Sequence, residues 1–244
     1  MNIFAAFRKG IHFFMFDKIN KTISLLLLST SVFAQKQELP KAEQSMIAQG
    51  LVNIRNVDPG ILVELKYSTT DNFLKKDIYA DLDRAYLQPE MAKRLAKANA
   101  QLAKLKPGYK LLVYDAARPN SAQYALWDAL DDLKIPARKK TMYVADPKIG
   151  SNHNFGCAVD LTVADENGKP LDMGTKFDFF GPLAYPRSEQ EMLQKGKLTI
   201  KQVENRQLLR KVMVQAGFRA NTTEWWHFDG MSKSQARARY GMIK

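Results

Sequence analysis

The sequence predicts an α+β fold in a single domain, with a small antiparallel sheet flanked by helices. Stretches with helical periodicity are mixed with short apolar stretches typical of strands, and predicted hairpins outnumber strand–helix–strand units. The composition is that of an ordinary globular protein, with 25% charged and 45% hydrophobic residues among 244. The single cysteine, Cys157, excludes an internal disulfide framework and any multi-cysteine zinc site.

Residues 1–34 have the pattern of a secretory signal peptide. Two lysines precede an apolar run, residues 22–34, which ends in Ala34 and is too short to span a bilayer comfortably. We therefore expect cleavage after Ala34, export to the periplasm or the cell exterior, and no stable membrane anchor on the cleaved protein. An uncleaved anchor is the alternative. Met15 offers a second start of translation, which would leave residues 1–14 outside the protein.

The polar segment 35–48 is expected to form a linker, and residues 49–244 the folded domain. Residues 51–65 contain alternating apolar residues around an Asp-Pro-Gly turn, which predicts a hairpin. Residues 88–105 carry apolar side chains at helical spacing, with Pro89 at a favoured helix start, and therefore predict a helix.

The rest of the domain is predicted to contain further strands and helices, separated by turn signals. In order, we expect a strand at 109–114, a helix at 121–133, a loop at 134–152, a strand at 157–163, a helix at 199–216 and a last strand at 222–228. The tail from Met231 is basic, and we expect it to lie in solvent.

The formal net charge is +12, from 37 basic and 25 acidic residues. A basic exported protein suits an anionic cell envelope, although net charge does not define a fold. The sequence has no basic helix or aromatic platform of the kind that binds nucleic acids, so we expect no nucleic-acid partner. Nothing in the sequence predicts the oligomeric state.

The two histidines that follow the predicted signal peptide lie in unusual sequence contexts. A catalytic zinc site takes three histidine or carboxylate ligands and keeps one position open for water. His153, Asp160 and His227 supply that set, for one zinc ion per chain, and Glu224 remains as the general base. Asp160 lies within an apolar strand, where an unpaired carboxylate is costly, so a metal is a good candidate partner.

The simpler interpretations of these residues remain open at this point. A lone histidine is more often a core or surface residue than a ligand, and Trp225 and Trp226 fit core packing. Asp115 and Arg118 at a strand end could form a plain surface ion pair. Residues three apart on a regular strand face opposite sides, so Glu224 and His227 share a site only if their segment bulges or begins as a loop.

The sequence resembles the VanX-type D-alanyl-D-alanine dipeptidases, within the wider group of zinc D,D-peptidases. The matching segments follow the family's order along almost the whole chain after the predicted signal peptide. They are 66–73 (KYSTTDNF), 114–119 (YDAARP), 151–160 (SNHNFGCAVD), 173–178 (MGTKFD), parts of 205–218, and 224–227 (EWWH). The first and fourth of these segments point to the dipeptidase branch. The Ala116-Ala117 pair is smaller than the family pattern, and Cys157 stands where a small residue is expected.

The resemblance implies the same ligands, His153, Asp160 and His227, with Glu224 as the catalytic base. It further implies roles for four other residues. Arg118 would bind the carbonyl oxygen as it becomes negative, and Ser151 would help to hold the substrate's carboxylate. Asp178 would pair with the substrate's free ammonium, with Tyr67 nearby.

We therefore expect a secreted zinc metallopeptidase that hydrolyses the D-alanyl-D-alanine dipeptide in cell-wall metabolism, using zinc-activated water and a glutamate base. A D,D-carboxypeptidase or peptidoglycan endopeptidase on the same scaffold is the first alternative, and Asp178 argues against it. A non-catalytic zinc module that binds envelope polymer is the second. Such a binder would need neither Glu224 nor Arg118.

Overall fold

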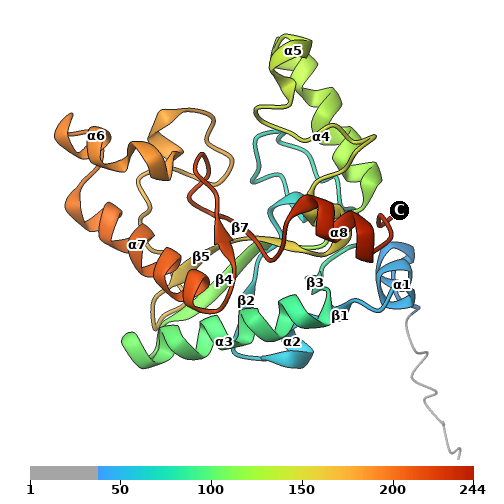
Figure 1. Cartoon of the computed structure of the whole chain (residues 1–244), viewed down its shortest axis with the longest axis horizontal. Helices are drawn as coiled ribbons and strands as arrows, with labels where there is room; N and C mark the ends of the chain where they lie inside the picture. Colours follow the sequence, from blue (N-terminus) through green and yellow to red (C-terminus); the bar gives the residue numbers. More distant parts are fainter. Residues whose placement is uncertain (1–37) are drawn as a thin grey trace, which may run out of the picture. The chain divides into compact units, whose positions relative to one another are not determined.

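A five-stranded sheet crosses the centre of the protein (Figure 1). The computed structural model describes residues 38–244, so the expected signal peptide and the first residues of the expected linker lie outside it. The strands run in the order β2 (Leu62–Val63), β4 (Lys110–Asp115), β5 (Ala158–Ala164), β7 (His227–Asp229) and β6 (Arg219–Ala220). Two further strands, β1 (Val52–Asn53) and β3 (Tyr86–Leu87), form a separate antiparallel pair.

Two long helices, α3 (Pro89–Leu105) and α7 (Ile200–Gln215), contact each other and the strands β4 and β5. The apolar residues of α3 recur at helical spacing, and Met91, Leu95 and Leu102 are fully buried. Burial of each such side chain contributes about 1.5–3 kcal/mol to stability. These contacts fix the central strands, on which the site is built.

The remaining helices are shorter than α3 and α7. They are α1 (Lys41–Ala48), α2 (Ile54–Val57), α4 (Asn120–Asp132), α5 (Ala137–Lys140), α6 (Glu189–Gln194) and α8 (Lys233–Arg239), with 3-10 turns η1 (Lys66–Ser68), η2 (Asn152–Phe155), η3 (Pro182–Ala184) and η4 (Pro186–Ser188). In Figure 1, α3 lies below the strands, whereas α4–α5 and α6 rise above them on either side. None of the helices within residues 38–244 is long and apolar enough to cross a bilayer.

The two faces of the central strands differ in what covers them. Val159, Leu161 and Val163 belong to the main core, whereas Ala164 on the alternate face packs with Tyr114 and the partly buried Phe177. All seven residues of β5 are buried. Asp160 is one of them, and its charge must therefore be compensated within the protein.

The predicted α+β class and single folded domain are confirmed, and the central elements lie within one or two residues of their expected bounds. The expected hairpin at residues 51–65 is wrong. Asn53 caps α2 by accepting a hydrogen bond from the backbone N–H of Arg55 at 3.0 Å, and this turn of helix sends β1 and β2 into different sheets. Because β2 pairs parallel with β4, the sheet is mixed rather than purely antiparallel.

The two ends of the domain are more ordered than their polar composition indicates. Residues 41–48, expected to be linker, form helix α1, and the buried Glu43 accepts a hydrogen bond of 2.7 Å from the Tyr86 hydroxyl. The C-terminal tail, expected to lie in solvent, forms α8. Near the chain end, the buried Ile243 donates its N–H to the carbonyl of Asn154 at 2.8 Å. Tertiary contacts outweigh the weak apolar pattern at both ends.

Gly156 makes the bend between η2 and β5. Its φ of +65° lies in the left-handed region, and an added Cβ would lie 2.7 Å from Leu51 Cδ2 and 3.3 Å from the backbone nitrogen of Gln88. Gly196 has almost the same φ, +64°, and an added Cβ there would have no neighbour within 4 Å. Comparing alanine substitutions at Gly156 and Gly196 therefore separates the effect of backbone strain from the effect of crowding.

We predict that Gly156→Ala destabilises the protein more than Gly196→Ala. Both changes place a side chain in the left-handed region, at about 1–2 kcal/mol, and crowding at position 156 adds about 1–3 kcal/mol. Each kcal/mol lowers the melting temperature of a domain of this size by about 2–4 °C. Thermal unfolding of the two variants measures the difference. Equal melting temperatures would show that the bend at Gly156 is not crowded.

Candidate active site and metal centre

Three potential metal ligands meet at one end of the central strands. Asp160 on β5 lies directly opposite His227 on β7 in the antiparallel register, and the bend at Gly156 returns His153 from η2 toward them. His153 Nε2 lies 3.1 Å from His227 Nδ1 and 3.4 Å from Asp160 Oδ1, and His227 Nδ1 lies 2.9 Å from Asp160 Oδ1. These three atoms form a compact triangle of donors.

The dimensions of this triangle fit a tetrahedral zinc site. Bonds of about 2.0–2.1 Å to nitrogen and oxygen donors separate neighbouring ligands of a tetrahedron by roughly 3.3 Å. The three measured separations are close to that value. Two histidines and one carboxylate leave a fourth corner open, which is the pattern of a catalytic rather than a structural zinc site.

Neighbouring acceptors orient both imidazole rings. His153 donates its Nδ1–H to the carbonyl of Ala116 at 2.7 Å, which leaves the Nε2 lone pair for a metal. His227 is arranged the other way round, because its Nε2 lies 3.2 Å from Asp229 Oδ1 and its Nδ1 faces the triangle. Asp229 is itself held by Asn152, whose side-chain N–H donates to it at 2.6 Å.

Asp160 is a buried carboxyl that stays ionised. Burial alone would raise the pKa of Asp160. The two adjacent histidines have the larger, opposite effect, so the pKa of Asp160 lies below its usual value. A buried anion with two nitrogen donors at its side provides a strong site for a divalent cation.

Glu224 reaches the same site from a turn. The last strand starts at His227, not at residue 222 as expected, and residues 221–226 form a turn that brings Glu224 and His227 to one side. Asn221 fixes this turn, since its side-chain N–H donates to Glu224 Oε2 at 3.1 Å and its Oδ1 accepts from the N–H of Thr223 at 2.8 Å. Burial raises the pKa of Glu224 above its usual value, which moves this carboxyl toward the range suited to general-base work.

Arg118 is held by a fully buried carboxylate. Asp115 Oδ2 accepts from Arg118 Nε at 2.9 Å and also from its Nη2, and Gln123 Oε1 accepts from Nη1 at 2.9 Å. These contacts use three of the five guanidinium N–H groups within the described part of the chain, which leaves two for a ligand. Asp115 is completely buried, so the interpretation of this pair as a plain surface ion pair is wrong.

Asp178 and Tyr67 form a second polar group across the cavity. The Tyr67 hydroxyl lies 3.1 and 3.0 Å from the two oxygens of Asp178 and donates to that carboxyl. Burial, followed by the charge of Asp160, raises the pKa of Asp178 well above its usual range. A cation placed against this carboxyl would therefore be bound strongly when the group is ionised.

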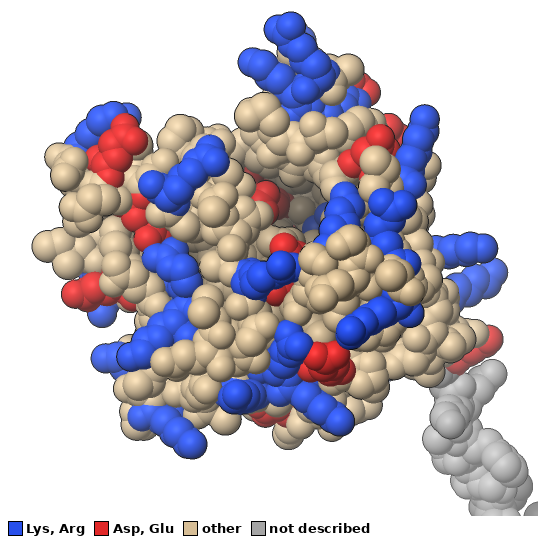
Figure 2. Space-filling view, viewed as in Figure 1, with Lys and Arg blue, Asp and Glu red and all other residues tan. Residues whose placement is uncertain are grey.

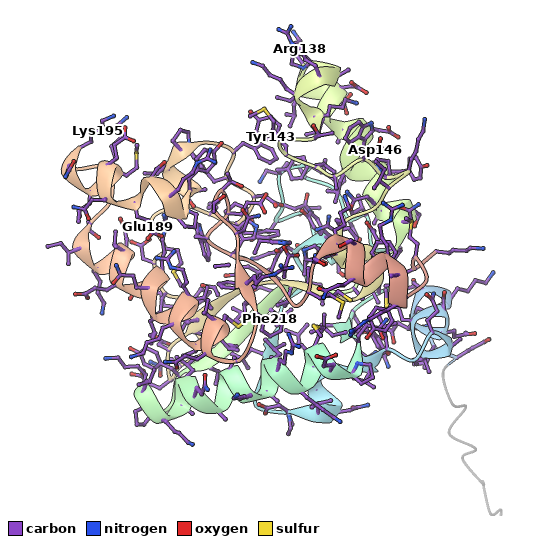
Figure 3. The ribbon with its side chains drawn as sticks, in the orientation of Figure 1. Arg138, Tyr143, Asp146, Glu189, Lys195 and Phe218 are labelled. Atoms are coloured by element: carbon purple, nitrogen blue, oxygen red, sulfur yellow. The ribbon has the colours of Figure 1, made fainter. Side chains whose placement is uncertain are left out.

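One cavity of about 360 Å³ unites the residues that the sequence analysis selected. It is lined by all eight of them: Tyr67, Arg118, Ser151, His153, Asp160, Asp178, Glu224 and His227. In Figure 2 it appears as a hollow with acidic side chains inside it and basic side chains around it. Tyr143, labelled in Figure 3 on the loop that follows α5, also lines this cavity. The volume suits a small ligand.

Ser151 contributes to the cavity from the turn that carries His153. Its hydroxyl lies 3.1 Å from Asn154 Oδ1, which also accepts from the Ser151 N–H at 2.7 Å. The side chain is therefore oriented locally while still facing the cavity.

Four further residues, which the sequence did not single out as functional, support the ligands and catalytic side chains. Asp115 holds Arg118, Asn221 holds Glu224, and Asp229, itself held by Asn152, holds His227. Asp115 ends the apolar strand β4 three residues before Arg118, and Asp229 ends β7 two residues after His227. These positions at strand ends, close to the selected residues, could have indicated both aspartates from the sequence. Trp225 and Trp226 are buried, as expected for core packing, although Trp226 also lines the cavity.

Comparisons with known proteins found a matching family model and several similar proteins. A family model described as D-ala-D-ala dipeptidase matches residues 47–242. A D-alanyl-D-alanine dipeptidase of Escherichia coli (strain K12) is 38% identical over 181 residues, which is 73% of this chain and 83% of the relative. Proteins of the same name from Synechocystis and Enterococcus faecium are 30% and 29% identical over 187 and 191 residues, covering 64% and 73% of this chain and 76% and 90% of the relatives.

We predict that replacing His153, Asp160 or His227 by Ala removes bound zinc, because loss of one ligand leaves only two protein donors. Asp229→Asn should keep the metal but weaken its binding about 10–100-fold, since it alters only the partner of His227. Elemental analysis and metal titration of the purified variants measure both effects. Full zinc occupancy in the His227→Ala protein would contradict the ligand assignment.

Proposed function

Because the chain belongs to the D-alanyl-D-alanine dipeptidase family, whose members are zinc metallopeptidases, we propose that it hydrolyses the D-alanyl-D-alanine dipeptide with one zinc ion per chain. The observation that carries the proposal is the presence of the ligand triangle, Glu224, Arg118 and Asp178 in one small cavity. A general base, an anion-stabilising group and a group for an ammonium are the parts that hydrolysis of a free dipeptide needs.

His153, Asp160 and His227 would hold the zinc ion. When bound, zinc acts as a Lewis acid that lowers the pKa of water and polarises the scissile carbonyl. The protein's own residues then have three tasks, which are to move a proton, to stabilise negative charge and to fix the dipeptide.

Glu224 would move the proton. Its carboxylate takes a proton from the attacking water and delivers it to the amine that leaves when the peptide bond breaks. The raised pKa supports both halves of this cycle, because the carboxyl must first accept a proton and then release it. The hydrogen bond from Asn221 holds one carboxylate oxygen, which leaves the other oxygen for the water.

Arg118 would stabilise the carbonyl oxygen as it becomes negative. Its two remaining N–H groups are suited to this task because Asp115 and Gln123 already hold the guanidinium still. Such preorganised donors act in a site with little water, where they stabilise charge more strongly than water does. Ser151, which also lines the cavity, would hold the substrate's carboxylate.

Asp178 would bind the free ammonium of the dipeptide and so define the length of the substrate. Asp178 lines the cavity, and the Tyr67 hydroxyl donates to its carboxyl at 3.0 Å. A peptide that continues beyond this point has an uncharged amide in place of the ammonium and leaves the Asp178 carboxylate without a charged partner. A dipeptide is therefore favoured over a longer peptide.

Export and a role in cell-wall metabolism also belong to the proposal. The apolar run at residues 22–34 and Ala34 support export, and residues 35–244 remain basic, with 33 Lys and Arg against 24 Asp and Glu, which suits an anionic envelope. N-terminal sequencing of the exported protein would read Gln35 first. An intact segment 25–28 on that protein would exclude cleavage at this point.

We predict that Glu224→Gln keeps zinc but lowers turnover of the dipeptide on the order of a hundredfold or more, because the amide fills the same space and cannot accept a proton. Steady-state kinetics and zinc content, measured on the same preparation, test this. Near-normal turnover with zinc bound would show that another group is the base.

We predict that free D-alanyl-D-alanine is cleaved far better than its N-acetyl form or a wall pentapeptide. Loss of the ammonium leaves Asp178 without its charged partner, which lowers kcat/KM about thirtyfold to several thousandfold. Asp178→Ala should narrow this gap by slowing the dipeptide much more than the acetylated substrate. A wild-type preference for the pentapeptide would contradict dipeptidase activity and favour the D,D-carboxypeptidase alternative.

A further inference from the structure

The segment that carries Asp178 has no regular secondary structure between residues 171 and 181. Asp178 itself has a φ of +60°, in the left-handed backbone region that residues other than glycine rarely adopt. Backbone strain of this kind persists only where the surrounding structure over-determines the conformation. The orientation of the Asp178 side chain toward the cavity must therefore be maintained by contacts elsewhere on the loop.

Helix α7 supplies these contacts at both ends of the loop. Asn205 donates from its side chain to the carbonyl of Asp172 at 2.9 Å. Arg206 donates from Nε to the carbonyl of Met173 at 2.7 Å and from Nη2 to the carbonyl of Leu183 at 3.0 Å. One guanidinium thus joins the start of the loop to its end.

The start of the loop is tightly fitted against the same helix. Gly174 has a φ of +79°, and an added Cβ would lie 2.3 Å from Leu198 Cδ2 and 3.1 Å from Gln202 Oε1. Gln202 also donates to Asp172 Oδ2 at 2.8 Å. Farther along the loop, the indole N–H of Trp225 donates to Thr175 Oγ1 at 2.7 Å.

Arg206 is an unusual residue for this position, because it is almost completely buried and its charge has little compensation. Glu189 Oε1 lies 3.8 Å from Nη1, which makes no hydrogen bond in the described part of the chain. Burial lowers the pKa of Arg206 to about 10, so the group is still charged at neutral pH. An apolar side chain could fill the same space, but it could not bind two carbonyls at once.

We propose that Asn205 and Arg206 are positioning residues that set the selectivity for the substrate's free amine, by holding the loop of residues 172–183 so that Asp178 is aimed into the cavity. Neither residue lines that cavity. The inference rests on the proposed function, since it assumes that Asp178 binds the ammonium.

Arg206→Met tests the proposal, with Arg210→Met as the matched control. Arg210 lies on the next turn of α7 and donates to the same Glu189, at 2.6 Å, and its side chain makes no hydrogen bond to the loop of residues 172–183. Figure 3 shows Glu189 at the start of α6, on the side facing α7. The two variants therefore remove an arginine from the same ion-pair cluster, but only one of them releases the loop.

The readout is the ratio of kcat/KM for free D-alanyl-D-alanine to that for its N-acetyl form, with zinc content measured in parallel. We expect Arg206→Met to lower this ratio at least tenfold, mainly through a higher KM for the free dipeptide, while zinc content stays at the wild-type level. Arg210→Met should keep the ratio within about twofold of wild type. A general loss of stability would slow both substrates alike and leave the ratio unchanged.

Two milder variants keep the test decisive if Arg206→Met does not fold. Asn205→Ala and Thr175→Val each remove one hydrogen bond to the loop and should lower the same ratio by a smaller factor. An unchanged ratio in the variants that fold and retain zinc would overturn the inference. A wild-type enzyme without preference for the free amine would instead overturn the proposed role of Asp178, so the two failures are distinguishable.

Discussion

The carboxylate of Asp160 lies in the middle of a fully buried strand, and the site is organised around the cost of that charge. Two histidines meet this carboxylate within 3.4 Å, because the β5–β7 register and the bend at Gly156 bring them there. An isolated buried anion would strongly oppose folding, whereas an anion with two imidazoles and an open corner forms a metal site. The same packing that stabilises the sheet thus creates the binding site.

A second layer of carboxylates determines how the first layer acts. Asp115 holds Arg118 and lies 3.5 Å from His153 Nδ1, and Asp229 fixes the ring of His227. Together with Asp160, Asp178 and Glu224 they make the interior of the cavity acidic, although the protein as a whole is basic. Such a cavity attracts cations. The two expected ligands are a divalent metal ion and a dipeptide whose ammonium group enters the cavity, and both bring positive charge to it.

Much of the site could be predicted from the sequence because its residues are chemically rare. The sequence has few histidines, one aspartate inside an apolar strand, and a glutamate three residues before His227. These residues leave few ways to assign a metal site, and the structure brings them together. The supporting residues could not be predicted in the same way, since Asn152 and Asp229 acquire their roles through contacts between segments distant in sequence. The fold was less predictable at the chain ends and at residues 51–65. There, helix α1 depends on a tertiary hydrogen bond of Glu43, and the cap at Asn53 overrides an apolar alternation typical of strands.

The most direct test of the account is an anomalous difference map at the zinc absorption edge, from crystals that contain a non-hydrolysable phosphinate analogue of the dipeptide. The account predicts one peak within about 2.0–2.2 Å of His153 Nε2, His227 Nδ1 and a carboxylate oxygen of Asp160. The analogue's ammonium should lie against Asp178. A metal bound through His227 Nε2, or one bound away from these three residues, would contradict the account.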